Sequence, residues 1–222
     1  MNDRFVLAID TSFGPVSAAL ANSTGEIVAH FEADNVPGTQ AETLPPRIAE
    51  MFSGAGVRFD RLDRIAVTVG PGAFTGVRVG LAFAKGLKVA TRAIVLGFST
   101  LECLAAQAAL NTPGANIAVA IDAKRAETYL QIFDAALVPV TDAALLPVEV
   151  AADVVRTRLA APAVFTGSGA ALVRDAFSGP AKIDLIARID TRLLARRAVI
   201  ANPEQHPPVA AYLRAADARL PT

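Results

Sequence analysis

The sequence predicts an α/β protein made of two tandem halves, each of which starts with an antiparallel β-meander. In the first half, three β-rich runs separated by turns span 5–9, 16–21 and 27–31. In the second half, an apolar run over 117–122 again ends in aspartate, and a return strand follows over 128–133. The repeated order of strand, aspartate, turn and strand indicates an internal duplication.

The clearest break in the chain is Asn-Thr-Pro-Gly at 111–114, since proline and glycine end regular elements. We expect an N-terminal domain over 1–110 and a more divergent C-terminal domain over 111–222, whose last helix, from about 209, packs back on the first domain. Ser99 and Glu102 form a capping-box pattern that predicts a helix to about Leu110. Further strands are expected over 64–69, 93–96 and 163–166, and further helices over 41–52, 76–90, 151–160, from 170, over 191–200 and over 209–218.

The bulk composition excludes several classes of protein. Of the 222 residues, 53% are hydrophobic, which excludes a disordered chain, and no run reaches the ~18 apolar residues of a membrane span. Lys and Arg total 21, as do Asp and Glu, so no overall charge attracts nucleic acid or a membrane. The single cysteine, Cys103, fits a reducing compartment, and the first residues lack a signal-peptide pattern. We therefore expect a cytoplasmic protein whose macromolecular partners are held by a local patch.

The stretch 67–86 reads as a strand, a glycine turn and a helix. The Gly-Pro-Gly turn at 70–72 ends the strand, and Thr75 is expected to cap a helix that begins at Gly76. Arg78 lies in the first helical turn, where a cation opposes the helix dipole. One interpretation is an anion-binding site at the free N–H groups of this turn, and the other is an ordinary surface arginine.

This helix carries two rows of small residues, although each glycine in a helix interior costs about 1 kcal/mol relative to alanine. Small side chains at every fourth position allow another helix to approach closely. One interpretation packs one row on the parent sheet and the other on a helix of the same domain. The other interpretation makes one row a docking face for another subunit. The two rows are Gly76, Gly80 and Ala84, and Ala82, Gly86 and Ala90.

Two aspartates end equivalent strands, and a Gly-Ser-Gly turn follows a third strand. Carboxylates at strand ends can hold a hydrated magnesium ion against phosphates, and a glycine turn lets the backbone approach a purine. This layout resembles the actin, hexokinase and chaperone ATPase superfamily, although the first turn lacks the glycines that usually wrap phosphates. The alternative is that both aspartates are turn or cap residues. The candidate nucleotide site comprises Asp10, Thr11, Ser12, Asp122, Gly167, Ser168 and Gly169.

Four short segments are more specific than this general layout. They read AIDTS at 8–12, GPGAFTGVRVG at 70–80, AKGL at 84–87 and DAKR at 122–125, the last followed by Tyr129. In these segments, and over nearly its whole length, the chain resembles the TsaB family, formerly called YeaZ. Two positions depart from the family pattern. Ala73 stands where the family often has serine, and Gln-Ala-Glu at 40–42 stands where many members read His-Ser-Glu.

The resemblance implies a non-catalytic partner of TsaD, the relative that transfers a threonylcarbamoyl group to the tRNA adenosine beside the anticodon. It implies pairing through the first domain, further partners in TsaE and a TsaC-type synthase, indirect contact with tRNA, and a homodimer or a monomer when alone. No cofactor is expected here, ATP or ADP being bound only in the assembled complex. We expect Gly80→Leu to abolish the pairing and leave the isolated fold nearly intact. The expected interface residues are Phe74, Thr75, Gly76, Arg78, Gly80, Ala84, Lys85, Leu44 and Ile48.

The residues that catalysis would need are missing from the sequence. The resemblance places the metal-binding histidine pair of TsaD on the helix that corresponds to 40–44, but this chain has only His30 and His206. It has no His-x-x-x-His pair, no cysteine cluster, no nucleophile elbow and no Walker loop. We therefore expect no catalytic residue and no metal site. The competing interpretations are an ATPase or phosphotransferase that holds magnesium with Asp10 and Asp122, and a metallopeptidase, which the missing ligands disfavour.

A basic stripe lies near the end of the second half. Arg188, Arg192 and Arg196 are spaced by four residues, with Arg197 beside them. On a helix, these side chains would either contact tRNA phosphates or form an ordinary solvated face.

Overall fold

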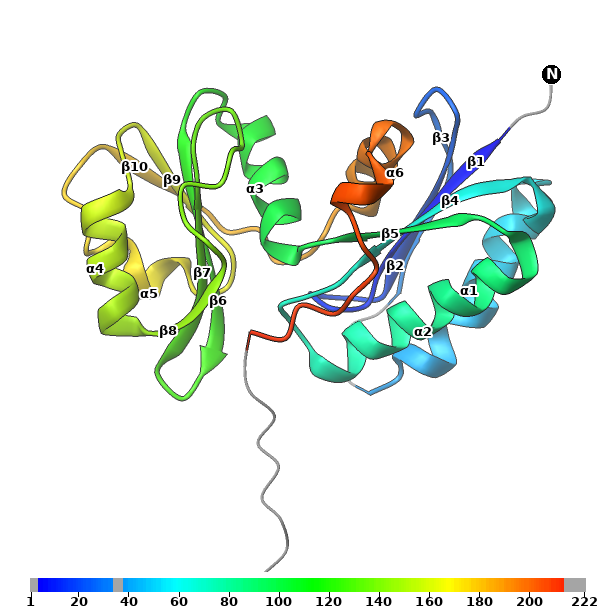
Figure 1. Cartoon of the computed structure of the whole chain (residues 1–222), viewed down its shortest axis with the longest axis horizontal. Coiled ribbons are helices and arrows are strands. Elements are labelled where there is room, and N and C mark those ends of the chain that lie inside the picture. The colour runs from blue at the N-terminus through cyan, green and yellow to red at the C-terminus, as the bar shows by residue number, and fades with distance from the viewer. Residues whose placement is uncertain (1–3, 34–37, 214–222) are drawn as a thin grey trace, which may run out of the picture.

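The protein, seen in a computed structural model that describes residues 4–33 and 38–213, is an α/β fold with two mixed five-stranded sheets (Figure 1). The first sheet has the order β3-β2-β1-β4-β5 and the second has the order β10-β9-β6-β7-β8. The first sheet comprises β1 (Phe5–Asp10), β2 (Ser17–Asn22), β3 (Ile27–Glu32), β4 (Leu62–Thr68) and β5 (Ile94–Phe98). The second comprises β6 (Asn116–Lys124), β7 (Glu127–Phe133), β8 (Ala144–Pro147), β9 (Ala163–Thr166) and β10 (Ala181–Asp184).

The two sheets repeat one strand order, which confirms the predicted duplication. In the first sheet β1 pairs antiparallel with β2 and parallel with β4. In the second sheet β6 pairs antiparallel with β7 and parallel with β9. Each half also begins with an antiparallel meander, β1-β2-β3 and β6-β7-β8, as the turn signals in the sequence predict.

Helices cover both faces of each sheet (Figure 1). Two helices pack on the outer face of the first sheet and two on the outer face of the second, while α3 and α6 lie between the sheets. β1 is covered on both faces and is buried from its second residue onward. A strand in this position can be apolar throughout, as the sequence of β1 nearly is. The helices are α1 (Gln40–Gly54), α2 (Phe74–Thr91), α3 (Thr100–Asn111), α4 (Val148–Arg158), α5 (Ala170–Arg174) and α6 (Thr191–Ile200), with short 3-10 turns η1 (Phe59–Arg61) and η2 (Pro203–Gln205).

The two middle helices are exchanged between the halves. Helix α3 follows β5 in the chain but packs on β6 and β9 of the second sheet, and α6 follows β10 but packs on β1 and β2 of the first. The core between the sheets therefore contains Val6, Leu104, Ile117 and Leu194, which come from both halves. The division of the chain into domains at residue 110 stays a prediction.

Two predicted helix starts have different outcomes. The Ser99 hydroxyl accepts from the backbone N–H of Leu101, and Glu102 closes the capping box, so the prediction for α3 is confirmed. The prediction that Thr75 caps a helix from Gly76 is wrong, because α2 begins at Phe74 and no side chain caps it. The start of α2 is set by tertiary contact instead: the N–H of Ala73 donates to the carbonyl of Ser12 at 2.8 Å.

The predicted helix over 209–218 is wrong for residues 209–213, which are not helical, and its remaining residues lie outside those that the structure describes. We call residues 206–212 the C-terminal strap. Gly97 donates its N–H to the carbonyl of His206 at 2.9 Å, and Ala211 donates to the carbonyl of Val69 at 2.8 Å. Through these two bonds the strap pairs with β5 and with the residue that follows β4. Within the described residues, no helix is long and apolar enough to cross a membrane.

Candidate functional site

Asp10, at the end of β1, lies at the centre of a buried hydrogen-bond network. Its Oδ1 accepts from the N–H of Ser12 at 3.0 Å, from the Ser12 hydroxyl at 2.8 Å and from the Thr68 hydroxyl at 2.5 Å. The Ser12 hydroxyl also lies 3.2 Å from that of Thr100. Complete burial raises the pKa of the Asp10 carboxyl, although the hydrogen bonds from Thr68 and Ser12 oppose this rise. The network joins the ends of β1 and β4 to the start of α3.

The glycines of the 70–80 segment allow α2 to contact the turn after β1. A side chain at Gly76 would overlap the carbonyl oxygen of Thr11, and one at Gly80 would place Cβ 2.5 Å from the Thr11 hydroxyl oxygen. That hydroxyl donates to the carbonyl of Gly76 at 2.6 Å. A side chain at Gly72 would likewise overlap the carbonyl of Ser12. These glycines therefore serve close packing within the first half, and the anion-site interpretation loses its main support.

The row of Gly76, Gly80 and Ala84 faces the parent sheet, so its predicted role as a docking surface is wrong. Leu44 and Ile48 of α1 are also buried, in the core beneath the first sheet, and their assignment to a partner surface is wrong for the same reason. The spacing of small residues predicts close packing but does not say which neighbour is packed.

The opposite face of α2 is exposed. It carries Phe74, Thr75, Arg78 and Lys85, the four remaining residues of the predicted interface. Phe74 exposes 53% of its surface, which is unusual for a large apolar side chain. The second row of small residues, Ala82, Gly86 and Ala90, lies on this face too. We call these seven residues, together with Val89, the α2 outer face.

The strap ends on this face. The Arg78 guanidinium lies 3.7 Å from the centre of the Phe74 ring, and its Nε donates to the Tyr212 hydroxyl at 3.1 Å. The centroids of the Phe74 and Tyr212 rings are 5.7 Å apart. No sequence motif marks Tyr212, although the last segment was expected to pack on the first domain.

The equivalent strand end in the second half is organised differently. Asp122 pairs with Lys124, whose Nζ lies 2.7 Å from Oδ2 and whose N–H donates to Oδ1 at 2.8 Å. These contacts lower the pKa of Asp122. The N–H of Asp122 donates to the Ser168 hydroxyl at 3.1 Å, and side chains at Gly167 and Gly169 would collide with the backbone of β6. The Gly-Ser-Gly turn therefore closes against β6.

The candidate nucleotide site stays a prediction. The carboxylates of Asp10 and Asp122 are both bonded to groups of their own chain, and Thr11 and Ser12 are buried beneath α2. In residues 4–33 and 38–213, no group of three His, Cys, Asp or Glu side chains has the arrangement to hold a metal ion.

The basic stripe is only partly helical, because Arg188 precedes α6. Each arginine of the stripe is held by a group of this chain, so a tRNA contact there stays a prediction. The partners are Glu32 for Arg188 at 3.2 Å, Asp190 for Arg192 at 2.9 Å, the carbonyl of Gly25 for Arg196 at 3.2 Å and Glu102 for Arg197 at 2.9 Å.

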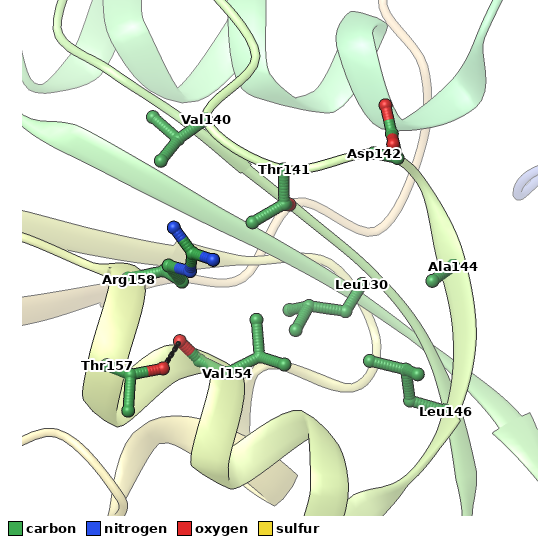
Figure 2. A pocket seen from close by; sticks show the side chains of 9 residues that line it. All are labelled: Leu130, Val140, Thr141, Asp142, Ala144, Leu146, Val154, Thr157 and Arg158. Carbon is green, nitrogen blue, oxygen red and sulfur yellow. Dashed lines mark hydrogen bonds between the residues drawn. The ribbon is translucent and has the colours of Figure 1, made fainter.

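A pocket of 560 Å³ lies on the second half, between α4, β7, β8 and the segment before β8 (Figure 2). Leu130, Leu146 and Val154 line it with apolar surface, and Arg158 and Thr141 add polar groups (Figure 2). The lining residues come from separate segments of the chain without a recognisable motif, so the sequence predicts no site here.

Comparisons with known proteins agree with the fold. The family model for TsaD, tRNA N6-adenosine threonylcarbamoyltransferase, matches residues 39–183. The tRNA threonylcarbamoyladenosine biosynthesis protein TsaB of Escherichia coli is 34% identical over 124 residues, which cover 56% of this chain and 52% of that protein. A tRNA N6-adenosine threonylcarbamoyltransferase of Anaplasma phagocytophilum is 31% identical over 48% of this chain and 35% of its own length. The chain thus spans about half the length, or less, of these curated relatives.

Solved structures extend the likeness over more of the chain. YeaZ from Pseudomonas aeruginosa superposes with a TM-score of 0.72 at 27% identity, covering 95% of this chain and 100% of that one. Component A of the (R)-2-hydroxyglutaryl-CoA dehydratase of Acidaminococcus fermentans superposes with a TM-score of 0.51 at 13% identity, over 91% of this chain and 98% of that one. The second likeness concerns the fold alone.

Proposed function

From the premise that this chain belongs to the TsaB (YeaZ) family and carries the TsaD family domain, we propose that it is a non-catalytic subunit for tRNA threonylcarbamoylation. In this proposal it pairs with a TsaD-type catalytic paralogue. The paralogue transfers the threonylcarbamoyl group to the tRNA adenosine beside the anticodon. The complex acts in the cytoplasm, where its tRNA substrate is.

The observation that carries the proposal is the exposed α2 outer face. It presents Phe74 and Arg78, which form one connected cluster with Tyr212 of the strap, and the row of Ala82 and Gly86 lies on the same face. Tyrosine and arginine are enriched among residues that dominate protein–protein binding energies. A cluster of this kind on a helix of the first half supports docking of another protein there.

The state of the two strand-end aspartates supports a non-catalytic role. Asp10 is completely buried and receives hydrogen bonds from Ser12 and Thr68, and Asp122 is paired with Lys124. Holding a hydrated magnesium ion would require both carboxylates to give up these partners. We therefore propose that this chain binds no nucleotide by itself and that ATP or ADP is held only in the assembled complex. TsaE and a TsaC-type synthase are the further proposed partners, and contact with tRNA is through the paralogue.

The test is reconstitution with the TsaD-type paralogue of the same organism. We expect the two proteins to co-elute in size-exclusion chromatography. We also expect tRNA modification by the paralogue, in the presence of the other pathway proteins, to depend on this chain. Modification at the same rate without this chain, or ATP hydrolysis by this chain alone, would contradict the proposal.

A further inference from the structure

The pocket on the second half has an apolar floor (Figure 2). Leu130 of β7 pairs with Ala144 of β8, and Leu146 lies two residues further along β8, so the three side chains share one face of the sheet. Val154 of α4 faces Leu130 (Figure 2). Alanine fills little of the space beside Leu130, and a volume of 560 Å³ remains between the helix and the edge of the sheet. Ligand pockets commonly enclose about 300–1,000 Å³, so this space has the size of a binding site.

Arg158, the last residue of α4, brings a positive charge to one end of the pocket. Figure 2 shows its guanidinium directed toward the segment that carries Val140 and Thr141. In the part of the chain that the structure describes, no group forms an ion pair or a hydrogen bond with this guanidinium. Arg156, two residues earlier on the same helix, is paired with Asp153 instead. The charge of Arg158 is therefore available to a molecule in the pocket.

The Thr141 hydroxyl adds a second donor at the same end. Its oxygen accepts from the N–H of Ile132 at 3.0 Å, and its own proton has no acceptor among the described residues. The Thr157 hydroxyl, by contrast, already donates to the carbonyl of Asp153 at 2.8 Å. Asp142, the one acidic residue among the nine described residues that line the pocket, directs its carboxylate away from the space (Figure 2). The polar end of the pocket thus presents donors and a positive charge.

We propose that this pocket binds a small aliphatic carboxylate, with the carboxylate on Arg158 and Thr141 and the hydrocarbon chain on the apolar floor. A guanidinium and a carboxylate form strong, often bidentate hydrogen bonds. The floor removes the chain from water, which also favours binding. At about 30 Å³ for each water-sized group, the volume of 560 Å³ accommodates at most about 18 non-hydrogen atoms, which suits a free acid.

Other occupants match the pocket less well. A nucleotide or another phosphate ester brings two or more negative charges, whereas Arg158 is the one cation among the nine described residues that line the space. A neutral lipid or a long alcohol matches the floor but leaves the guanidinium without a partner. The C-terminus of another protein carries the same carboxylate, but its chain continues beyond the volume available.

The test is a titration of the isotope-labelled full chain with octanoate, followed by the chemical shifts of the backbone amides. We expect saturable shifts at the residues of β7, β8 and α4 that line the pocket. Octanoate has about ten non-hydrogen atoms, for which we expect a dissociation constant of about 1 mM or tighter. Octan-1-ol has the same chain without the charge and should bind about tenfold more weakly. Raising the salt concentration from about 50 mM to about 300 mM should weaken the binding of octanoate and not that of octan-1-ol.

Three variants separate the charge from the floor. Arg158→Gln should weaken octanoate binding about tenfold and leave octan-1-ol binding unchanged. Arg156→Gln is the matched control on the same helix, since Arg156 does not line the pocket, and it should bind both probes like the native chain. Ala144→Leu fills part of the floor and should weaken both probes about tenfold. Arg156 and Arg158 are exposed, so their replacement should leave the fold intact.

Several results would overturn the proposal. These are the absence of saturable shifts at the pocket, equal affinity of the native chain and Arg158→Gln for octanoate, and equal affinity of the native chain for octanoate and octan-1-ol. Tighter binding of a capped tripeptide that ends in leucine would overturn it too, by making a protein C-terminus the occupant. None of these results bears on the proposed pairing, because α4 and α2 lie at opposite ends of the molecule (Figure 1).

Discussion

Replacing Gly80 by alanine tests whether the glycine row of α2 serves internal packing. The new Cβ would lie 2.5 Å from the Thr11 hydroxyl oxygen and 3.2 Å from a methyl group of Val67. Thr11 would have to move, which endangers its buried hydrogen bond to the carbonyl of Gly76. Overpacking costs about 1–3 kcal/mol, and a buried donor left without its partner costs about 1–3 kcal/mol. The higher helix propensity of alanine offsets about 1 kcal/mol of this loss of stability.

We therefore expect Gly80→Ala to lower the free energy of unfolding by about 1–5 kcal/mol. Gly86→Ala is the matched control on the same helix, because its Cβ would meet nothing within 4 Å, and it should stabilise the fold by about 1 kcal/mol. Urea unfolding followed by circular dichroism measures both, with equal slopes required for the comparison. If Gly80→Ala is as stable as Gly86→Ala, the row does not pack as described. Gly80→Leu, with its larger side chain, should unfold the chain rather than spare it.

Three further predictions concern the middle helices. Asp190→Asn should destabilise the protein at neutral pH. Burial raises the pKa of Asp190, but hydrogen bonds from Arg192 outweigh this effect and lower the pKa below 3.8. The carboxylate's contribution to the free energy of unfolding is therefore present above pH 3.8 and lost as pH falls through the folded-state pKa. Urea midpoints measured as a function of pH should show the native and variant proteins converge at low pH. Ser99→Ala removes the cap of α3 and should cost about 1 kcal/mol by thermal unfolding, whereas an unchanged midpoint would mean the cap contributes nothing. Burial raises the pKa of the Cys103 thiol well above its usual value, so maleimide should label it only at the rate of unfolding; fast labelling of folded protein would show an accessible thiol.

Local patterns predicted the duplicated strand order and the capping box, because strand runs, turns and caps are encoded within a few residues. The exchange of α3 and α6 between the sheets depends on which surfaces meet over long separations, and no local pattern reports it. The two small-residue rows of α2 show the same limit. Their spacing predicted close approach, but only the structure distinguishes the row against Thr11 from the exposed row at Gly86.

Only part of the candidate site was predicted, because local patterns do not report contacts between distant segments. Phe74 and Arg78 belong to a recognisable segment, whereas Tyr212 joins them from more than a hundred residues away. A helix was expected from residue 209, within the strap, but the N–H of Ala211 bonds to the carbonyl of Val69 and residues 209–213 are not helical.

Hydrogen–deuterium exchange of this chain with and without the TsaD-type paralogue tests the central claim most directly, since it reports which backbone amides the partner protects. We expect exchange to slow over 74–92 and 206–212 and to stay unchanged over α4 and β8. Protection confined to the second half, with no change along α2, would contradict it.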